Sequence, residues 1–111
     1  MKHSTRTPTK AERQRMERLA LLGCIACRLV PAHNSGRPAE VHHLLSGNRR
    51  LGHMHTVPLC RWHHRGEPDT GIHTSVMRGL YGPSLAFHGK AFHEAYGSDA
   101  DLLNYTNQLL L

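Results

Sequence analysis

Histidines are concentrated in one stretch of this chain. Between Glu40 and His64 the sequence carries six histidines and one cysteine, and a cysteine pair, Cys24 and Cys27, precedes the stretch. Imidazole and thiolate are ligands that zinc prefers, and imidazole is also the side chain best suited to move protons near neutral pH. The residue types therefore indicate metal binding, acid–base chemistry, or both.

The spacing of the cysteines separates one metal site from the remaining histidines. Cys24 and Cys27 are three residues apart, and Cys60 and His63 repeat that interval. Two such pairs commonly supply the four tetrahedral ligands of a structural zinc ion. The sequence therefore predicts a structural zinc site in which His63 is preferred as the fourth ligand because it repeats the cysteine interval. His64 is the alternative.

Five histidines of the stretch remain once His63 is assigned to zinc. His53 is expected to be solvated or structural, which leaves His42, His43, His55 and His64 as candidates for chemistry. A metal ion that hydrolyses a phosphodiester needs ligands that leave positions open, and it needs a base nearby. Neighbouring side chains on a strand point to opposite faces, so His42 and His43 are expected to divide the tasks of ligand and base.

This arrangement resembles the HNH nucleases, whose ββα-metal motif consists of two strands and a helix around a divalent ion. The resemblance rests on His42-His43, on His55 twelve residues later and on His64 nine residues further, framed by the CxxC and LCxxH segments. It implies that His43 is the general base and that His42 and His64 bind a catalytic Mg²⁺, Mn²⁺ or Zn²⁺. His55 stands where the family usually has an asparagine, and it orients the base or holds its tautomer.

A narrower resemblance extends from about residue 24 to the C-terminus. The segments HHLLSGNRRLGHMHTVPLCRWHH and GPSLAFHGKAFHEAYGSDADLL are similar to the phage recombination-enhancement (Ref-like), RecA-dependent nucleases. The resemblance implies a metal-dependent DNA endonuclease that acts in recombination. A dependence on a RecA filament and a phage or prophage origin follow from the family and not from the residues. In that group a further histidine completes the catalytic metal site, for which His88 is preferred and His73 is the rival.

The charge of the chain favours a polyanionic partner. The net charge is +6, and residues 1–22 carry +4 whereas residues 91–111 carry −3. A basic surface of this kind suits DNA, although many small basic proteins bind nothing specific. Four arginines are placed to hold a DNA phosphate, and a purely solvated role is the alternative for each of them. They are Arg49, Arg50, Arg61 and Arg65.

The elements that position these residues are expected to be short helices and short strands. Thr9-x-x-Glu12 is typical of a capping box and predicts a helix over about 10–22, with Arg13, Arg15 and Arg18 in solvent. Cys24 and Cys27 are expected on a tight turn. Strands are expected over 39–45 and 56–59, separated by a polar loop at 46–50, and helices from residue 60 and over about 90–96 and 98–110. Residues 69–86 resist assignment.

The fold class predicted from these elements is α+β, a small zinc-stabilised ββα-metal domain with flanking N- and C-terminal helices. We expect a basic N-terminal arm and helix over 1–22 and a nuclease domain with a C-terminal helix over 23–111. No run approaches the roughly 20 apolar residues of a membrane span, and the cysteine pattern favours metal over disulfides. A cytoplasmic location in a bacterial host cell is therefore expected. We further expect a monomer or weak dimer, for which no pattern in the residues argues.

Two other functions compete with hydrolysis. A non-catalytic zinc module that only binds nucleic acid accounts for the cysteines and the basic charge, but it leaves His42, His43, His55 and His64 unexplained. A CxxC redox protein is weaker, because no βαβ pattern surrounds Cys24 and Cys27. Plasmid nicking with Mg²⁺ or Mn²⁺, compared with an EDTA control, distinguishes the nuclease from both.

Overall fold

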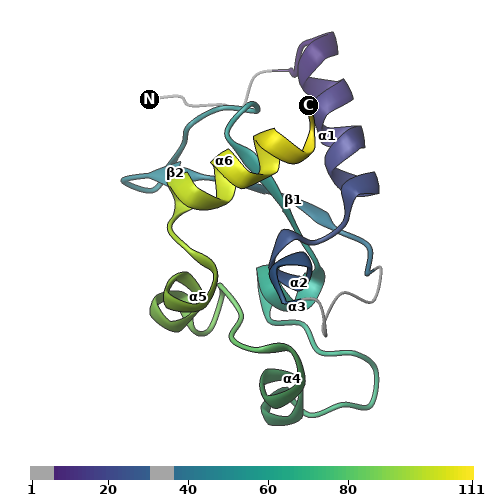
Figure 1. Cartoon of the computed structure of the whole chain (residues 1–111), viewed down its shortest axis with the longest axis vertical. Coiled ribbons are helices and arrows are strands. Elements are labelled where there is room, and N and C mark those ends of the chain that lie inside the picture. The colour runs from purple at the N-terminus through teal and green to yellow at the C-terminus, as the bar shows by residue number, and fades with distance from the viewer. Residues whose placement is uncertain (1–6, 31–36) are drawn as a thin grey trace.

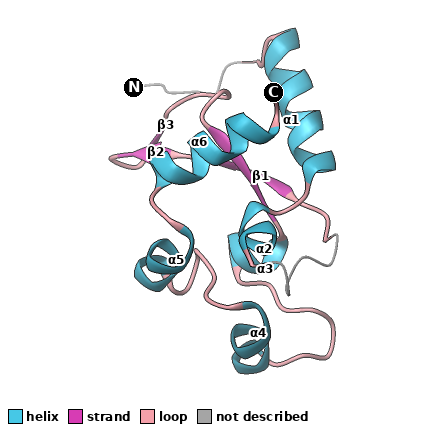
Figure 2. Ribbon diagram, in the orientation of Figure 1, coloured by secondary structure: helices cyan, strands magenta, loops and turns pink. Residues whose placement is uncertain are grey.

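The computed structural model describes residues 7–30 and 37–111; residues 1–6 and 31–36, which include part of the predicted basic arm, lie outside it. The fold is α+β, as predicted, with short helices around two small two-stranded sheets (Figure 1, Figure 2). The elements in chain order are α1 Lys10–Leu22, α2 Ile25–Leu29, β1 Glu40–His43, β2 Leu45–Ser46, β3 Arg49–Arg50, β4 Thr56–Leu59, α3 Arg61–Arg65, α4 Thr74–Tyr81, α5 Gly89–Tyr96 and α6 Asp99–Leu109.

The strands β1 and β4 form the sheet that carries most of the chemistry. They run antiparallel, with Glu40 opposite Leu59 and His43 opposite Thr56. All four residues of β4 are buried. Because the sheet has only two strands, β4 keeps one unpaired edge and tolerates Pro58. Cys60 follows β4 directly and begins α3, so the position of that helix is fixed by the sheet.

The segment between β1 and β4 is a hairpin rather than a loop. The predicted strand over 39–45 ends at His43, and β2 and β3 pair across a two-residue turn. Both turn residues have positive φ, 58° at Gly47 and 67° at Asn48, which matches the left-handed turn that connects tightly paired strands. Glycine and asparagine tolerate this conformation best, so the turn is set by local sequence.

Helix α1 begins as predicted. The Thr9 side chain accepts from the backbone N–H of Glu12, and the Glu12 carboxylate accepts from the backbone N–H of Thr9, which completes the capping box. The helix packs on both β1 and β4. The predicted division at residue 22 therefore separates two segments that are in direct contact.

The expectation that Arg15 lies in solvent is wrong. Its side chain is buried between α1, β4 and α6, where the guanidinium donates to the Thr56 hydroxyl, the Thr56 carbonyl and the Asn107 amide oxygen. These three hydrogen bonds offset the cost of removing a charge from water. Burial lowers the pKa of Arg15. The residue thus joins both terminal helices to the sheet.

The C-terminal third contains one unpredicted helix and two predicted ones. Helix α4 lies within the unassigned region and is capped by His73. Helix α5 begins at Gly89, one residue before its predicted start, and a capping box of Ser98 and Asp101 opens α6. Helix α6 packs on β4 (Figure 1). No helix within the described ranges is both long and apolar enough to cross a lipid bilayer.

The core gathers around Trp62, whose side chain is fully buried and whose indole N–H donates to the carbonyl of Gly82. The apolar side chains that surround the zinc ligands and this ring come from α2, β4, α4, α5 and α6, and Leu19 of α1 is a further buried apolar side chain. The surrounding side chains include Ile25, Val57, Leu59, Met77, Phe92 and Leu102.

Candidate metal centres and catalytic residues

Helix α3 presents three consecutive residues to three different surroundings. Successive residues of an α-helix are rotated by about 100°, so residues two apart point to nearly opposite sides. His63 faces the cysteines, His64 faces β1, and Trp62 faces the ring of His88. The clustered histidines of the sequence are thereby separated into different sites.

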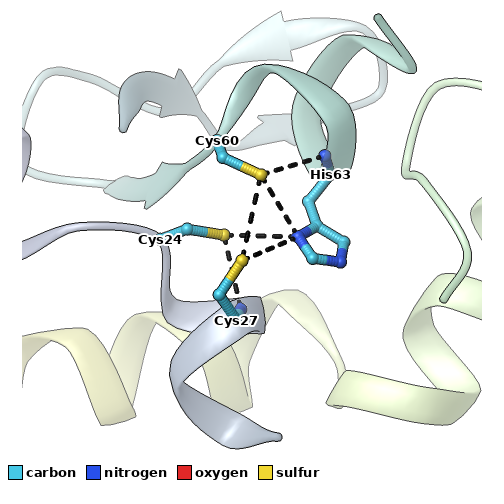
Figure 3. Close-up of side chains that lie close together, drawn as sticks. All are labelled: Cys24, Cys27, Cys60 and His63. Atoms are coloured by element: carbon cyan, nitrogen blue, oxygen red, sulfur yellow. Dashed lines mark hydrogen bonds between the residues drawn. The ribbon is translucent and has the colours of Figure 1, made fainter. Parts of the chain in front are cut away.

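The four residues predicted to bind zinc come together. Nδ1 of His63 lies 3.4 Å from Sγ of Cys24, 3.5 Å from Sγ of Cys27 and 3.3 Å from Sγ of Cys60 (Figure 3). The four ligand atoms lie within 4.8 Å of one another, and all four residues are buried. A zinc ion with Zn–S of about 2.3 Å and Zn–N of about 2.0 Å places its ligand atoms roughly 3.5–3.8 Å apart. This Cys3His cluster therefore suggests a structural metal such as zinc.

The backbone around the cluster favours thiolates. Cys24 and Cys60 each cap a helix, α2 and α3, and their sulfurs accept from the backbone N–H of Cys27 and His63. The predicted tight turn at Cys24 is thus the start of a short helix. Helix N-termini and N–H donors stabilise the charged form of a thiol, which is the form that binds metal.

His63 is held for coordination through Nδ1. Its other ring nitrogen, Nε2, lies 2.8 Å from the carbonyl oxygen of Tyr81 and 3.2 Å from the hydroxyl of Tyr96. A proton on Nε2 that is donated to the carbonyl leaves the Nδ1 lone pair for the metal. Burial opposes a positive charge on the imidazole, whereas the sulfurs of Cys24 and Cys60 favour it and raise the pKa of His63 to about 10. The cluster thus demands positive charge, which fits a divalent cation.

Arg37 adds a further positive charge beside the cluster. Its guanidinium makes two hydrogen bonds to the Asp69 carboxylate, of 2.9 Å and 2.5 Å, and lies 4.8 Å from the centre of the Tyr81 ring. Hydrogen bonding to Asp69 raises the pKa of Arg37; burial opposes the rise and Cys60 adds to it. Three thiolates around one divalent ion carry a net negative charge, and Arg37 offsets only part of it because Asp69 already pairs with the guanidinium.

His42 and His64 form a second pair of nitrogen atoms. Nδ1 of His42 lies 3.2 Å from Nε2 of His64, and Nδ1 of His64 lies 2.9 Å from the Glu40 carboxylate. Two nitrogens bound at about 2.1 Å to one ion lie roughly 3.0–3.4 Å apart, so the pair has the separation of two ligands of one ion. Burial, with His64 as the next cause, lowers the pKa of His42 to about 4. The ring is neutral at physiological pH, as a metal ligand must be.

His43 faces a different partner from the one predicted. Its Nε2 lies 3.0 Å from Nδ1 of His53, a buried residue that the sequence gave no catalytic role. The side chain of His55 is exposed, and its carbonyl accepts from the backbone N–H of Leu44, beside His43. Burial, Arg50 and His53 lower the pKa of His43. The neutral imidazole is the form that accepts a proton from water.

His88 and His73 lie apart from the His42–His64 pair. His88 accepts from the backbone N–H of Ser84 and contacts Trp62, on the side of α3 opposite His64. His73 is exposed and caps α4. Within residues 7–30 and 37–111, the Cys3His cluster forms the only group of three or more ligand atoms close enough for one ion. A third ligand from either histidine stays a prediction.

The four candidate arginines differ in their partners. Arg61 and Arg65 form ion pairs with Glu67, and Arg65 also binds the Glu40 carboxylate. Arg49 and Arg50 are exposed on β3, and the ion pairs found within the described ranges do not include them. The positive charge of Arg50 also helps to lower the pKa of His43. The positive charge on the β2–β3 hairpin is therefore less neutralised by carboxylates than the positive charge of Arg61 and Arg65 on α3.

Sequence reasoning missed two residues of the candidate site. Glu40 lies two residues before His42, so the alternation of side chains along a strand places both on one face of β1. That spacing was a usable signal. His53 gave no comparable signal, because its contact with His43 depends on the course of the chain from β3 to β4.

The chain matches the model of one protein family over nearly its whole length. A family model described as recombination enhancement, RecA-dependent nuclease matches residues 8–111, which include α1, the Cys3His cluster and both histidine pairs. The match covers nearly the whole chain, so the terminal helices belong to the matched region together with the histidine-rich centre. This chain therefore belongs to the recombination enhancement, RecA-dependent nuclease family.

Proposed function

We propose that the chain is a metal-dependent DNA endonuclease of the HNH type, in which β1, β4 and α3 form a ββα-metal motif. Its nuclease role in recombination is supported by the family match. The observation that carries the proposal is the separation of the adjacent His42 and His43 into two different imidazole pairs. One pair fits a metal ion and the other fits a general base.

The pair of His42 and His64 would hold the catalytic ion, whether Mg²⁺, Mn²⁺ or Zn²⁺. Glu40 accepts the proton on Nδ1 of His64, which leaves the lone pair of Nε2 directed toward His42. A divalent ion bound there supplies positive charge for the scissile phosphate and the leaving 3′ oxygen. His88 remains our candidate for a third ligand, with His73 as rival; its ring now contacts Trp62 and would have to leave that contact to bind the ion.

His43 would accept the proton of the attacking water. When Nε2 of His43 donates to Nδ1 of His53, the lone pair lies on Nδ1 of His43 and is available as a base. His53 therefore replaces His55 in our proposal as the residue that fixes the tautomer of the base. His55 would instead connect the base strand to the following loop through its carbonyl.

DNA phosphates would be held first by Arg49 and Arg50. Both lie on the hairpin that follows the His43 strand, and a guanidinium binds phosphate oxygens strongly. Arg61 and Arg65 would contribute less, because carboxylates already neutralise part of their charge. We further propose that a RecA filament presents the DNA and that the chain acts as a monomer or weak dimer.

Plasmid nicking by the zinc-loaded protein with Mg²⁺ or Mn²⁺ tests the proposal. His43→Ala should abolish nicking and leave bound zinc unchanged, because the base is separate from the Cys3His cluster. His53→Ala should lower the rate by about tenfold to hundredfold, since an unoriented base loses part of a general-base contribution of about 10²–10⁴. His55→Ala is the matched control and should nick at close to the parent rate.

The outcomes separate three readings. If His43→Ala nicks as fast as the parent, the base assignment is wrong. If His55→Ala is impaired and His53→Ala is not, the histidine that positions the base is the one favoured by the family pattern. A parent protein that binds DNA but nicks nothing, with or without RecA filaments, supports the non-catalytic zinc module instead.

A further inference from the structure

A cavity lies on the side of α3 that carries Trp62, opposite His64. Its volume is about 410 Å³, within the range of roughly 300–1,000 Å³ that is usual for ligand pockets. No carboxylate lines it. Its walls come from α3, α4 and the segment that leads into α5, and they are formed by Trp62, Thr74, Ser75, Arg78, Phe87 and His88.

Phe87 supplies an exposed aromatic surface at this cavity. Its side chain is 65% exposed, which is unusual for a ring that buries readily. The ring is nevertheless held in place, because it covers Gly66 so closely that a Cβ added there would lie 2.3 Å from its atoms. The backbone N–H of Phe87 also donates to the buried hydroxyl of Ser84. The exposure is therefore built into the fold.

The polar groups of the cavity can all donate hydrogen bonds. Arg78 lies one helical turn after Thr74 and Ser75, so its guanidinium and the two hydroxyls share one face of α4. A cavity with one exposed aromatic ring, one guanidinium, hydroxyl donors and no carboxylate fits an aromatic anion.

We infer that this cavity binds one unpaired nucleotide of DNA, with its base against Phe87 and its phosphate near Arg78 and the α4 hydroxyls. A paired base cannot present its face to an aromatic ring, whereas an unstacked base can do so. Stacking of this kind tolerates any base and gives little sequence preference. The cavity therefore selects DNA structure rather than DNA sequence.

The position of the cavity deepens the proposed nuclease function and rests on it. Trp62 and His64 are two residues apart on α3, so the cavity and the His42–His64 pair are separated by about one helix diameter, roughly 10–12 Å. At about 3.4 Å per nucleotide, the rise of a stacked strand, this corresponds to at most roughly three nucleotides, and to fewer where the strand is extended. The bound unpaired nucleotide would lie within about three nucleotides of the scissile phosphate.

Fluorescence anisotropy of labelled DNA tests the inference. Zinc-loaded protein, without added Mg²⁺ or Mn²⁺, is titrated into a single-stranded oligonucleotide of about 20 nucleotides, which is longer than the distance between the cavity and the His42–His64 pair. It is titrated separately into a hairpin duplex. Phe87→Leu should weaken single-strand binding about fivefold to hundredfold and leave duplex binding nearly unchanged, because it removes a stacking surface. Phe87→Trp should retain binding. Arg78→Gln should weaken single-strand binding and reduce its salt dependence by about one phosphate contact.

The matched control is Leu80→Ala, which truncates an exposed apolar residue on α4 that does not line the cavity. Its single-strand affinity should equal that of the parent. The inference is overturned if Phe87→Leu binds single strands as the parent does, or if it loses single-strand and duplex binding equally. It is also overturned if free dTMP or ATP displaces the 20-mer at micromolar concentration, which would indicate a free-nucleotide site.

Plasmid nicking by the same preparations keeps the two proposals distinguishable. A parent that does not nick, but binds single strands through Phe87, removes the nuclease proposal and retains the nucleotide site. A parent that nicks, together with a Phe87→Leu variant of unchanged single-strand affinity, removes the nucleotide site alone. Melting temperature and zinc content confirm that each variant is folded.

Discussion

At the scale of single residues, the histidines differ by the atom that each nitrogen faces. His63 faces sulfur on one side and the Tyr81 carbonyl on the other, whereas His64 faces His42 and the Glu40 carboxylate. A carboxylate or carbonyl on one ring nitrogen fixes the tautomer and directs the other nitrogen toward metal. Glu40 is therefore the residue whose removal most directly tests the second metal site.

We expect Glu40→Ala to weaken Mn²⁺ binding by about tenfold to hundredfold, the usual effect of removing a carboxylate that orients a metal-binding histidine. Isothermal titration of Mn²⁺ into the zinc-loaded protein measures the change. Glu67→Ala is the matched control, because Glu67 pairs with Arg65, as Glu40 does, but makes no contact with His64. Equal Mn²⁺ affinity in the parent and Glu40→Ala would contradict a metal site at this pair.

At the scale of elements, the segment between α3 and α4 is attached to the zinc site by an ion pair. Asp69 lies in this segment, and its carboxylate accepts two hydrogen bonds from Arg37, whose side chain is 14% exposed. Tyr81 at the end of α4 contacts the same guanidinium and also accepts from His63 through its carbonyl. The position of α4 is thus coupled to the Cys3His cluster.

Asp69→Asn should lower the free energy of unfolding by roughly 1–2 kcal/mol at pH 7, because it weakens a charge-assisted pair that is largely buried on one side. Hydrogen bonding to Arg37 lowers the pKa of Asp69 below its ordinary value of 3.8. A carboxylate with a lowered folded-state pKa stabilises the fold above the ordinary value, and that contribution is lost as the pH falls through the folded-state value.

The measurement is the difference in melting temperature between the parent and Asp69→Asn at several pH values. The difference should be constant from pH 8 to about 5 and should shrink as the pH falls below 3.8. Glu67→Gln, which alters the more exposed ion pairs of the same segment, should change the melting temperature little. A difference between parent and Asp69→Asn that grows at low pH would contradict the assigned role of the Arg37 pair.

At the scale of the whole molecule, the Cys3His cluster joins parts of the chain that a small core holds weakly. Cys24 and Cys27 come from the start of α2, Cys60 follows β4, and His63 lies on α3 (Figure 3). A chain of this size buries a modest share of its surface on folding, so a metal link adds a substantial part of its stability. Removing the metal should therefore affect the entire fold and not only the site.

Cys24→Ala should lower the zinc content and the melting temperature together. A loss of about 3 kcal/mol corresponds to a fall in melting temperature of roughly 10–20 °C for a chain of this size. His63→Ala should behave in the same way, whereas His64→Ala is the matched control and should retain one zinc per chain, because His64 faces β1. Unchanged zinc stoichiometry in Cys24→Ala would remove the structural site.

The sequence alone was sufficient wherever the physics is local. The capping boxes at Thr9 and Ser98 predict the starts of α1 and α6, and equal intervals in two ligand pairs predict the Cys3His cluster. The choice of His63 over His64 also follows from spacing. Each capping box and each ligand pair spans only three residues, so its geometry is nearly fixed by the backbone. The meeting of the two ligand pairs, which are 33 residues apart, follows instead from the preference of zinc for four such ligands.

Only the tertiary structure decided which distant residues meet. It paired His43 with His53 instead of His55, buried Arg15 against Thr56, and placed His88 beside Trp62. Each contact depends on how loops cross and on which side of a helix faces the sheet, and neither property follows from spacing along the chain. The sequence does not reveal what a given histidine contacts, because the same imidazole can bind a metal, accept a proton or pack against a ring.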